Sequence, residues 1–320
     1  MEKNELRIVF LGTPDFAVES LRRIVDGGYN VVGVVTMPDK PAGRGKHLQQ
    51  SAVKQFAVSR GLKVMQPERL KDDAFVEELR SLQADLFIVI AFRMLPEVVW
   101  SMPRLGTFNL HASLLPRYRG AAPINRAVMN GDAETGVTTF FLKHEIDTGD
   151  IIAQERIAIG PDEDAGSVHD RLMELGATLT IDTIEHILAG DLKPIPQDEL
   201  LKGEEPTPAP KIFKDTCRID WNSPARDIHN HVRGLAPYPA AWSTLIAGDT
   251  PQGSLKVFAT RVLDEKSTSA PGTLTVTDGR LIADTATERI ELLSVQAPGK
   301  KRMPTADFLR GCRLEQMRLE

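Results

Sequence analysis

Polar side chains gather in one short stretch of the chain, Asn109 to Arg119, whose sequence is Asn-Leu-His-Ala-Ser-Leu-Leu-Pro-Arg-Tyr-Arg. The stretch begins within Gly106–Leu110, a run that is typical of a strand. Asn109 and His111 are two residues apart, so in a strand both side chains point to the same face. An amide and an imidazole in this arrangement could face one polar ligand.

Asp147 is the second candidate, in a turn of sequence His-Glu-Ile-Asp-Thr-Gly-Asp that follows another expected strand, Val137–Leu142. A carboxylate near an imidazole would hold the ring charged and oriented. Spacing alone favours a simpler interpretation, in which these polar residues cap loops at strand ends. No metal site is expected, because an Asn and a His with a remote Asp fall short of the usual ligand density.

Strands and helices alternate in the first half of the chain. Apolar runs too short for helices, such as Leu6–Leu11, Val31–Val35 and Asp85–Ile90, are separated by segments with helical spacing. The alternation predicts an α/β fold with a Rossmann-like parallel sheet and helices on both faces. Ligands bind such sheets at the carboxyl ends of the strands, where Asn109 and His111 lie.

The first turn between strand and helix, Gly12–Ala17, does not carry the pattern that binds a dinucleotide. That pattern needs a second and a third glycine so that the backbone can approach a pyrophosphate, and only Gly12 is present. We therefore expect neither NAD nor a flavin. A long amphipathic segment, Ser167–Leu188, is expected to pack on the sheet.

Prolines are dense between residues 190 and 210, which suits an extended connector. We therefore predict a catalytic domain at 1–189, a linker at 190–210 and a second domain at 211–320. The pattern in the second domain changes to short runs typical of strands, which suggests a small β-barrel of the OB type. These runs are Ala241–Ile246, Leu255–Val262, Thr273–Val276, Arg280–Ala283 and Arg289–Val295.

Charge is divided unevenly along the 320 residues. The net charge is −5, but residues 1–205 carry 23 Lys and Arg against 31 Asp and Glu, whereas residues 206–320 carry 16 against 13. The difference permits a polyanion-binding module beside an acidic one. No apolar run approaches the length of a membrane span, and the start of the chain lacks the apolar stretch of a secretory signal, so we expect a cytoplasmic protein.

The chain resembles the folate-dependent formyltransferases. The resemblance rests first on Asn109-Leu-His111, Ser113-Leu-Leu-Pro116 and Asp147-Thr-Gly-Asp150. Within the family it is similar to the members that formylate initiator methionyl-tRNA. This closer likeness spans nearly the whole chain, through Phe10-Leu-Gly-Thr-Pro-Asp-Phe16, Pro41-Ala-Gly-Arg-Gly-Lys46, Pro116-Arg-Tyr-Arg-Gly-Ala-Ala-Pro-Ile124, Arg218-Ile-Asp-Trp221 and Asp307-Phe-Leu-Arg-Gly311.

The resemblance implies an enzyme that transfers a formyl group from 10-formyltetrahydrofolate to an amine. Asn109 and His111 would then donate hydrogen bonds to the anionic oxygen of the tetrahedral intermediate, and Asp147 would stabilise charged His111 and accept a proton. Ser113, Leu114, Leu115 and Pro116 are the implied folate-binding segment. The segment Ala91–Pro96 is expected to line the same cleft.

The implied partners are folate and initiator methionyl-tRNA, for a monomeric enzyme without metal. Arg44 and Lys46 would contact the tRNA. Further candidates for phosphate contacts are Lys211, Lys214, Arg218, Lys300, Lys301, Arg302 and Arg310. Trp221 and Trp242 are expected in the core. Two alternatives stay open: a sugar-nucleotide or small-amine formyltransferase with the same Asn, His and Asp, and an RNA-binding protein without catalysis.

Overall fold

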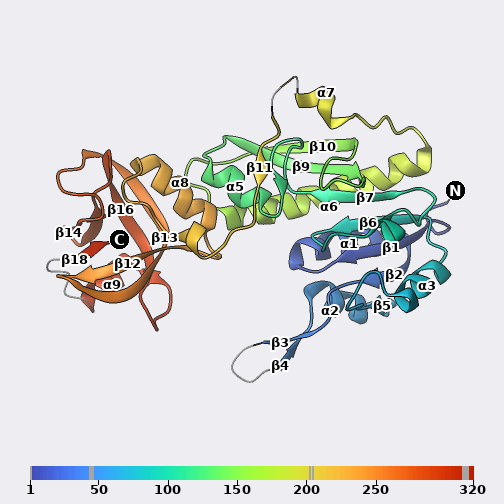
Figure 1. The fold of residues 1–320 in the computed structure, drawn as a ribbon, viewed down its shortest axis with the longest axis horizontal. Helices are drawn as coiled ribbons and strands as arrows, with labels where there is room; N and C mark the ends of the chain where they lie inside the picture. The colour runs from blue at the N-terminus through green and yellow to red at the C-terminus, as the bar shows by residue number, and fades with distance from the viewer. Residues whose placement is uncertain (1, 43–46, 202, 204, 312–316) are drawn as a thin grey trace. The chain divides into compact units, whose positions relative to one another are not determined.

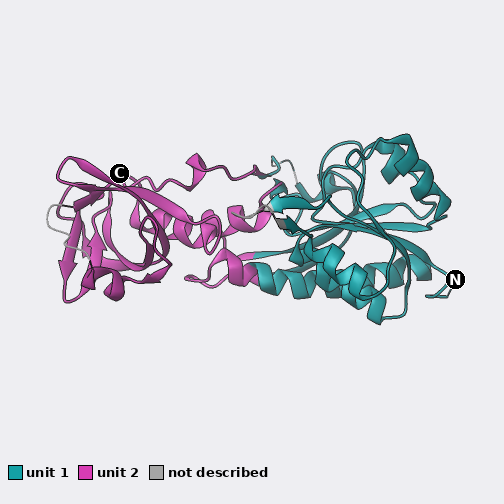
Figure 2. Ribbon diagram, turned by 90° about the horizontal axis from the view of Figure 1, so that it is seen from below, with its two compact units in different colours: residues 1–120, 135–157, 169–208 teal, residues 121–134, 158–168, 209–320 magenta. Residues whose placement is uncertain are grey.

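The computed structural model describes residues 2–42, 47–201, 203, 205–311 and 317–320 (Figure 1). The chain divides into two compact units that are interleaved in sequence (Figure 2). Unit 1 comprises residues 1–120, 135–157 and 169–208, and unit 2 comprises 121–134, 158–168 and 209–320. These units group residues by contact, and the domain limits 1–189, 190–210 and 211–320 stay a prediction.

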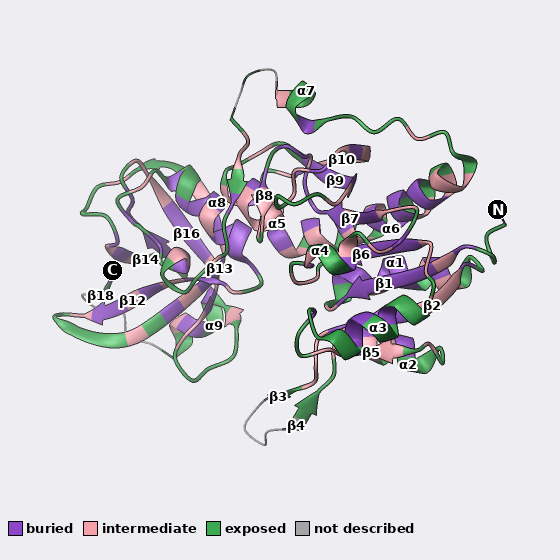
Figure 3. Cartoon of the chain, turned by 45° about the vertical axis from the view of Figure 1, so that its right-hand side comes forward, coloured by how far each residue is buried: buried purple, intermediate pink, exposed green. Residues whose placement is uncertain are grey.

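Unit 1 is built on a sheet with the strand order β10–β9–β7–β6–β1–β2–β5. Its strands are β1 (Arg7–Gly12), β2 (Asn30–Val35), β5 (Val64–Met65), β6 (Leu86–Ile90), β7 (Thr107–His111), β9 (Glu134–Phe141) and β10 (Ile151–Ala158). β6 consists only of Leu, Ile, Phe and Val and is buried throughout (Figure 3), as expected of a strand covered on both faces. The strands from β7 to β5 pair in parallel, which confirms the Rossmann-like prediction.

Helices cover both faces of this sheet. They are α1 (Asp15–Asp26), α2 (Ala52–Ser59), α3 (Asp73–Ser81), α4 (Glu97–Trp100) and α6 (Ala165–Ala189), of which α6 corresponds to the long segment expected at 167–188. α3 and α4 pack over side chains such as Val9, Phe87 and Val89. α6 lies on the opposite face, because Thr183 Oγ1 is 2.8 Å from Thr139 Oγ1 of β9.

Three features of unit 1 differ from the expectation. β9 runs antiparallel to β7, so the sheet is mixed at this edge. The segment expected as an extended connector also contains a helix, α7 (Gln197–Leu201), whose first residue is buried. The connector then pairs with β8 (Arg119–Gly120) through β11 (Pro208–Ala209), and Arg119 N donates to Thr207 O at 3.1 Å. A short hairpin, β3 (Lys40–Ala42) and β4 (His47–Gln49), was not expected either.

Unit 2 contains the antiparallel sheet β14–β15–β16–β13–β12–β18, which closes almost completely. Its strands are β12 (Ala241–Ala247), β13 (Thr250–Lys266), β14 (Leu274–Thr277), β15 (Arg280–Ala283), β16 (Glu288–Gln296), β17 (Met303–Pro304) and β18 (Met317–Leu319). An antiparallel bridge between Thr273 and Arg318 joins the two ends. Inside lie Trp221, Leu255 and Val257, which form one apolar cluster with α8 (Ala225–Leu235). The predicted barrel is confirmed.

The described part of unit 2 also holds shorter helices. They are α5 (Pro123–Met129), the 3-10 turn η1 (Asp215–Cys217) and α9 (Thr305–Arg310). α5 packs closely on α8, because Asn125 Nδ2 donates to the carbonyl oxygen of Gly234 at 2.8 Å, and a Cβ at Gly234 would lie 2.4 Å from the Met129 side chain.

Candidate active site

β7 places Asn109 and His111 on one face of the sheet, as their spacing predicted. Asn109 pairs with Val89 of β6 and with Phe140 of β9, so it shares the face that α3 and α4 cover. Leu110 points the other way, where Gly176 of α6 lies against its side chain. The Asn109 side chain is half-buried and forms no hydrogen bond with any residue that the structure describes. Its amide is therefore available to a ligand.

His111 is nearly buried, at 8% exposure, and is held through one ring nitrogen. Nε2 lies 2.8 Å from the carbonyl oxygen of Tyr118. A carbonyl oxygen only accepts hydrogen bonds, so Nε2 carries a proton and donates it. Nδ1 faces Oδ2 of Asp147 at 3.9 Å. The ring can therefore offer a donor at Nδ1 only when both nitrogens are protonated.

Backbone groups hold Asp147 in place. Its Oδ2 accepts a hydrogen bond from Gly120 N at 2.9 Å, and its own backbone has a φ of 56°. Gln197 Nε2 donates to the carbonyl oxygens of Asp147 and Gly149, each at 2.9 Å. Gly149 is required for this turn, because a Cβ there would lie 1.5 Å from the Phe141 carbonyl oxygen.

The segment Ser113–Pro116 forms a closely bonded loop after β7. Thr138 Oγ1 donates to the Ser113 carbonyl at 2.6 Å and accepts from Leu115 N at 3.2 Å. Ser113 Oγ donates to Arg117 O at 2.6 Å. Leu115 packs in the core with Phe140 and Ile151, whereas Leu114 keeps part of its side chain accessible. Of the four predicted folate-binding side chains, Leu114 therefore has the most surface to offer a ligand.

Unusual backbone conformations gather in the segments around these residues. Ala91, directly after β6, has a φ of 48°, and Tyr118 has a φ of 62°. Together with Asp147, they occupy a region that is costly for residues other than glycine, and such residues cluster at functional sites. Their number supports a site at this edge of the sheet.

Arg93 fastens the expected cleft segment Ala91–Pro96 to a neighbouring loop. Its guanidinium donates to the carbonyl oxygens of Pro67 and Glu68. Burial lowers the pKa of the Arg93 guanidinium from its usual value. Its Nε is buried and has no partner among the described residues.

Sequence analysis did not identify Tyr118, Gly120 or Gln197 as site residues. Tyr118 and Gly120 lie in the motif that follows Pro116, so the motif contained them without indicating their backbone roles. Gln197 lies in the proline-rich connector, where no sequence motif indicated a functional residue. Arg44 and Lys46 lie outside the described residues, between β3 and β4 in the sequence.

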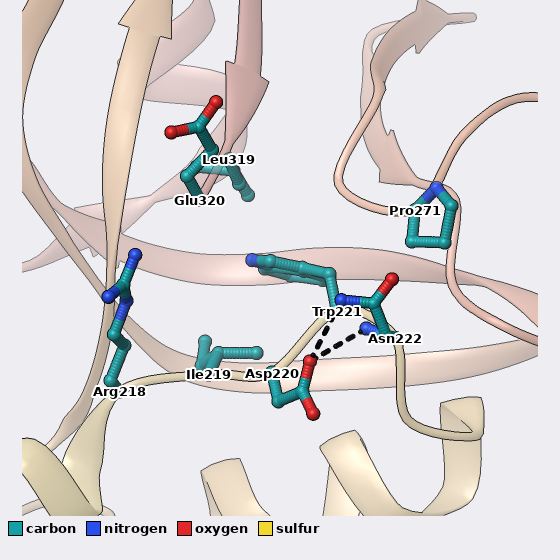
Figure 4. A pocket seen from close by; sticks show the side chains of 8 residues that line it. All are labelled: Arg218, Ile219, Asp220, Trp221, Asn222, Pro271, Leu319 and Glu320. Carbon is teal, nitrogen blue, oxygen red and sulfur yellow. Dashed lines mark hydrogen bonds between the residues drawn. The ribbon is translucent and has the colours of Figure 1, made fainter.

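A separate cavity of about 460 Å³ lies in unit 2. Figure 4 shows the side chains around it, including Arg218, Trp221, Asn222 and Glu320. It contains none of the predicted catalytic residues. Within the described ranges there is no cluster of His, Cys, Asp and Glu that could hold a metal ion. Every helix described here is too short or too polar to cross a lipid bilayer.

Two family models match the chain. The Formyl transferase model matches residues 6–184, and the model of the Formyl transferase C-terminal domain matches residues 211–313. The chain is 58% identical over 318 residues to the methionyl-tRNA formyltransferase of Bacteroides fragilis. The aligned region covers 99% of this chain and 98% of that relative. It is 60% identical over 315 residues to the methionyl-tRNA formyltransferase of Parabacteroides distasonis, covering 97% of each.

Solved structures with the same fold are more distant in sequence. The N-formyltransferase of Helicobacter canadensis, in complex with folinic acid and dTDP-3-aminofucose, has a TM-score of 0.66 at 19% identity, over 91% of this chain and 99% of that protein. HypX of Aquifex aeolicus, in complex with tetrahydrofolic acid, has a TM-score of 0.63 at 19% identity, over 95% of this chain. This chain spans 46% of HypX. These likenesses establish the fold.

Proposed function

Because the chain belongs to the methionyl-tRNA formyltransferase family, we propose that it transfers the formyl group of 10-formyltetrahydrofolate to the amino group of initiator methionyl-tRNA. The products are formylmethionyl-tRNA, for translation initiation, and tetrahydrofolate. The observation that carries the proposal is the 58% identity to a relative of that name over 99% of the chain, which includes both compact units. We expect a monomer in the cytoplasm.

The reaction is an acyl transfer to nitrogen. The free amine of the methionyl group attacks the formyl carbon, and the formyl oxygen becomes an anion in the tetrahedral intermediate. The bond between this carbon and N10 of the folate then breaks as the oxyanion collapses. The attacking nitrogen loses a proton, and N10 gains one as tetrahydrofolate leaves. Catalysis therefore requires donors aimed at the oxyanion and a group that moves protons.

Asn109 and His111 supply the donors in this proposal. The Asn109 amide donates without titrating, and its lack of a protein partner among the described residues supports the role. His111 gives Nε2–H to the Tyr118 carbonyl, so its second donor has to be Nδ1–H of the imidazolium. Asp147 presents Oδ2 to this nitrogen at 3.9 Å, so its carboxylate can orient the ring. Asp147 also takes the proton lost by the amine, directly or through water.

The substrates are assigned to two loops. Ser113–Pro116 borders the folate, with Leu114 as its accessible apolar side chain. Arg44 and Lys46, which lie outside the described residues, are assigned to the tRNA because their fixed positive charges can contact phosphates. Holding both substrates together removes much of the entropic barrier to their reaction.

One assay tests the proposal. The purified protein is incubated with 10-formyltetrahydrofolate and methionyl-tRNA, and formylmethionine is measured after the ester bond to tRNA is hydrolysed. An N109A protein prepared in the same way controls for contaminating enzyme. Product that depends on Asn109 supports the proposal. Formylation of an amino-sugar nucleotide in preference to methionyl-tRNA would assign the chain to the alternative, a sugar-nucleotide formyltransferase.

A further inference from the structure

An exposed aromatic ring stands among basic side chains in unit 2. We call the group formed by Phe213, Trp242, Lys211, Lys214 and Arg218 the aromatic–basic patch. Phe213 is 63% exposed, although a phenyl ring is normally buried. Lys211 Nζ lies 5.7 Å from the centre of the Phe213 ring. The patch therefore presents an aromatic face beside a positive charge.

Trp242 continues the patch with two more cations. Lys214 Nζ lies 5.6 Å from the centre of the indole, and Arg218 Cζ lies 5.9 Å from it. The indole is fixed, since its Nε1 donates to the Lys214 carbonyl at 2.9 Å. Ile219 N donates to the Trp242 carbonyl at 2.9 Å and ties the segment to β12. Trp242 was expected in the core; it is half-buried, with part of its surface packed against the apolar cluster of unit 2 and the two cations near its ring.

Phe213 is held in place by its backbone. Cys217 Sγ donates to the Phe213 carbonyl at 3.3 Å, and Phe213 N donates to Thr216 Oγ1 at 3.3 Å. Both partners belong to η1. These bonds fix the backbone that carries the ring, and a phenyl side chain has only two χ angles left to order when a ligand stacks on it.

The cations of the patch stand apart from the carboxylates that the structure describes. Lys211, Lys214 and Arg218 make no ion pair with any residue in the described part of the chain. In the same unit, carboxylates pair with Arg261, Lys266, Arg280, Arg289, Arg310 and Arg318. Asp220 is near in sequence, but its Oδ1 accepts hydrogen bonds from Asn222 (Figure 4). Three unpaired cations around aromatic rings favour an anionic ligand with a flat face.

We propose that Phe213 is a stacking platform for an unpaired base of the tRNA, and that Lys211, Lys214 and Arg218 contact the adjoining phosphates. The assignment of the RNA as tRNA rests on the proposed function. Every base has a π-face that can stack on an exposed ring, and phosphates are the natural partners of the unpaired cations. An acidic protein could pair with the three cations, but such a partner would not explain why the Phe213 ring is exposed.

Binding of labelled tRNA to the full-length protein, measured by fluorescence anisotropy, tests the proposal. We expect F213L to raise Kd about tenfold, because leucine keeps an apolar side chain but loses the aromatic face. F213Y keeps the face and should bind within about twofold of the wild type. V276A is the matched control, since Val276 is an exposed apolar residue of β14 in the same unit. Thermal unfolding of each variant checks that it is folded.

Salt dependence separates stacking from charge. K211A and K214A should each lower the slope of log Kd against log salt by about 0.7 to 0.9, whereas F213L should leave the slope unchanged. The proposal is overturned if F213L binds tRNA as tightly as the wild type, or if the wild type does not bind tRNA. Folate is absent from this measurement, so failure of formyl transfer would count against the proposed function alone.

Discussion

A backbone group, and not a side chain, determines which ring nitrogen of His111 carries a proton. The carbonyl oxygen of Tyr118 fixes Nε2–H, and the Gly120 amide fixes the Asp147 carboxylate that faces Nδ1. Backbone atoms thus orient both titratable groups of the site. The positions of His111 and Asp147 therefore depend on the path of the backbone from 118 to 120 as much as on which residues occupy the site.

In the proposed mechanism, replacing Asn109 with alanine removes a hydrogen-bond donor to the developing oxyanion. We expect kcat to fall by about 10² to 10³, while the Kd of folate changes little, because the donor acts mainly in the transition state. Single-turnover formylation gives the rate, and equilibrium titration with folate gives the affinity. An equal loss in both quantities would make Asn109 a binding residue instead.

At this scale the sequence predicts some of the site and not the rest. The spacing of Asn109 and His111 places them on one face because side chains alternate along any strand. The contacts of Tyr118 and Gly120 are made by backbone atoms, which every residue type has, so residue identity does not reveal them. Gln197 reaches the Asp147 turn from 50 residues along the chain, and no local pattern links the two.

The turn between β9 and β10 is the element that positions Asp147. Its path requires Gly149, since any Cβ there would overlap the Phe141 carbonyl oxygen. The same turn is held from outside by Gln197 at the start of α7. The element is therefore set by a close approach between backbones and by one buried side chain.

Gly149→Ala is expected to displace this turn and Asp147 with it. Because a shift of about 1 Å in a catalytic group can cost about 10²-fold, kcat should fall by about that factor, and the melting temperature should fall as well. Gly311→Ala is the matched control, since a Cβ there would meet no atom closer than 3.9 Å. Activity and thermal unfolding of both variants provide the measurement. Wild-type kcat in Gly149→Ala would show that the turn does not set the Asp147 position.

Elements with a strong local pattern are predicted well from sequence. The helix α6 and the strand β15 occur almost where their apolar residues indicated. The direction of β9 is not encoded locally, because an antiparallel strand has the same alternation as a parallel one. The helix α7 is too short to show a period within its proline-rich surroundings, so composition alone predicted an extended segment.

For the whole molecule, charge is divided unevenly between the two parts of the chain. Residues 206–320 carry a net charge of 16 − 13 = +3, and residues 1–205 carry 23 − 31 = −8. We expect tRNA affinity to fall steeply as salt rises, because bound phosphates release counterions, whereas folate affinity should hardly respond. Titrations of both ligands between about 50 and 200 mM salt measure the two slopes. A flat response for tRNA would contradict a basic RNA-binding part.

The path of the chain through its two units limits how recombination between genes can exchange one unit for another. The chain passes from one unit to the other after residues 120, 134, 157, 168 and 208, so no single crossover in the gene separates them. A gene that inherited a foreign end from residue 209 onward would keep its own 121–134 and 158–168. These would then have to accept a foreign α8, although Asn125 bonds Gly234 and buried Arg233 bonds the carbonyls of Gly160 and Glu163. A foreign α8 would therefore have to preserve these contacts with 121–134 and 158–168, which belong to the same unit.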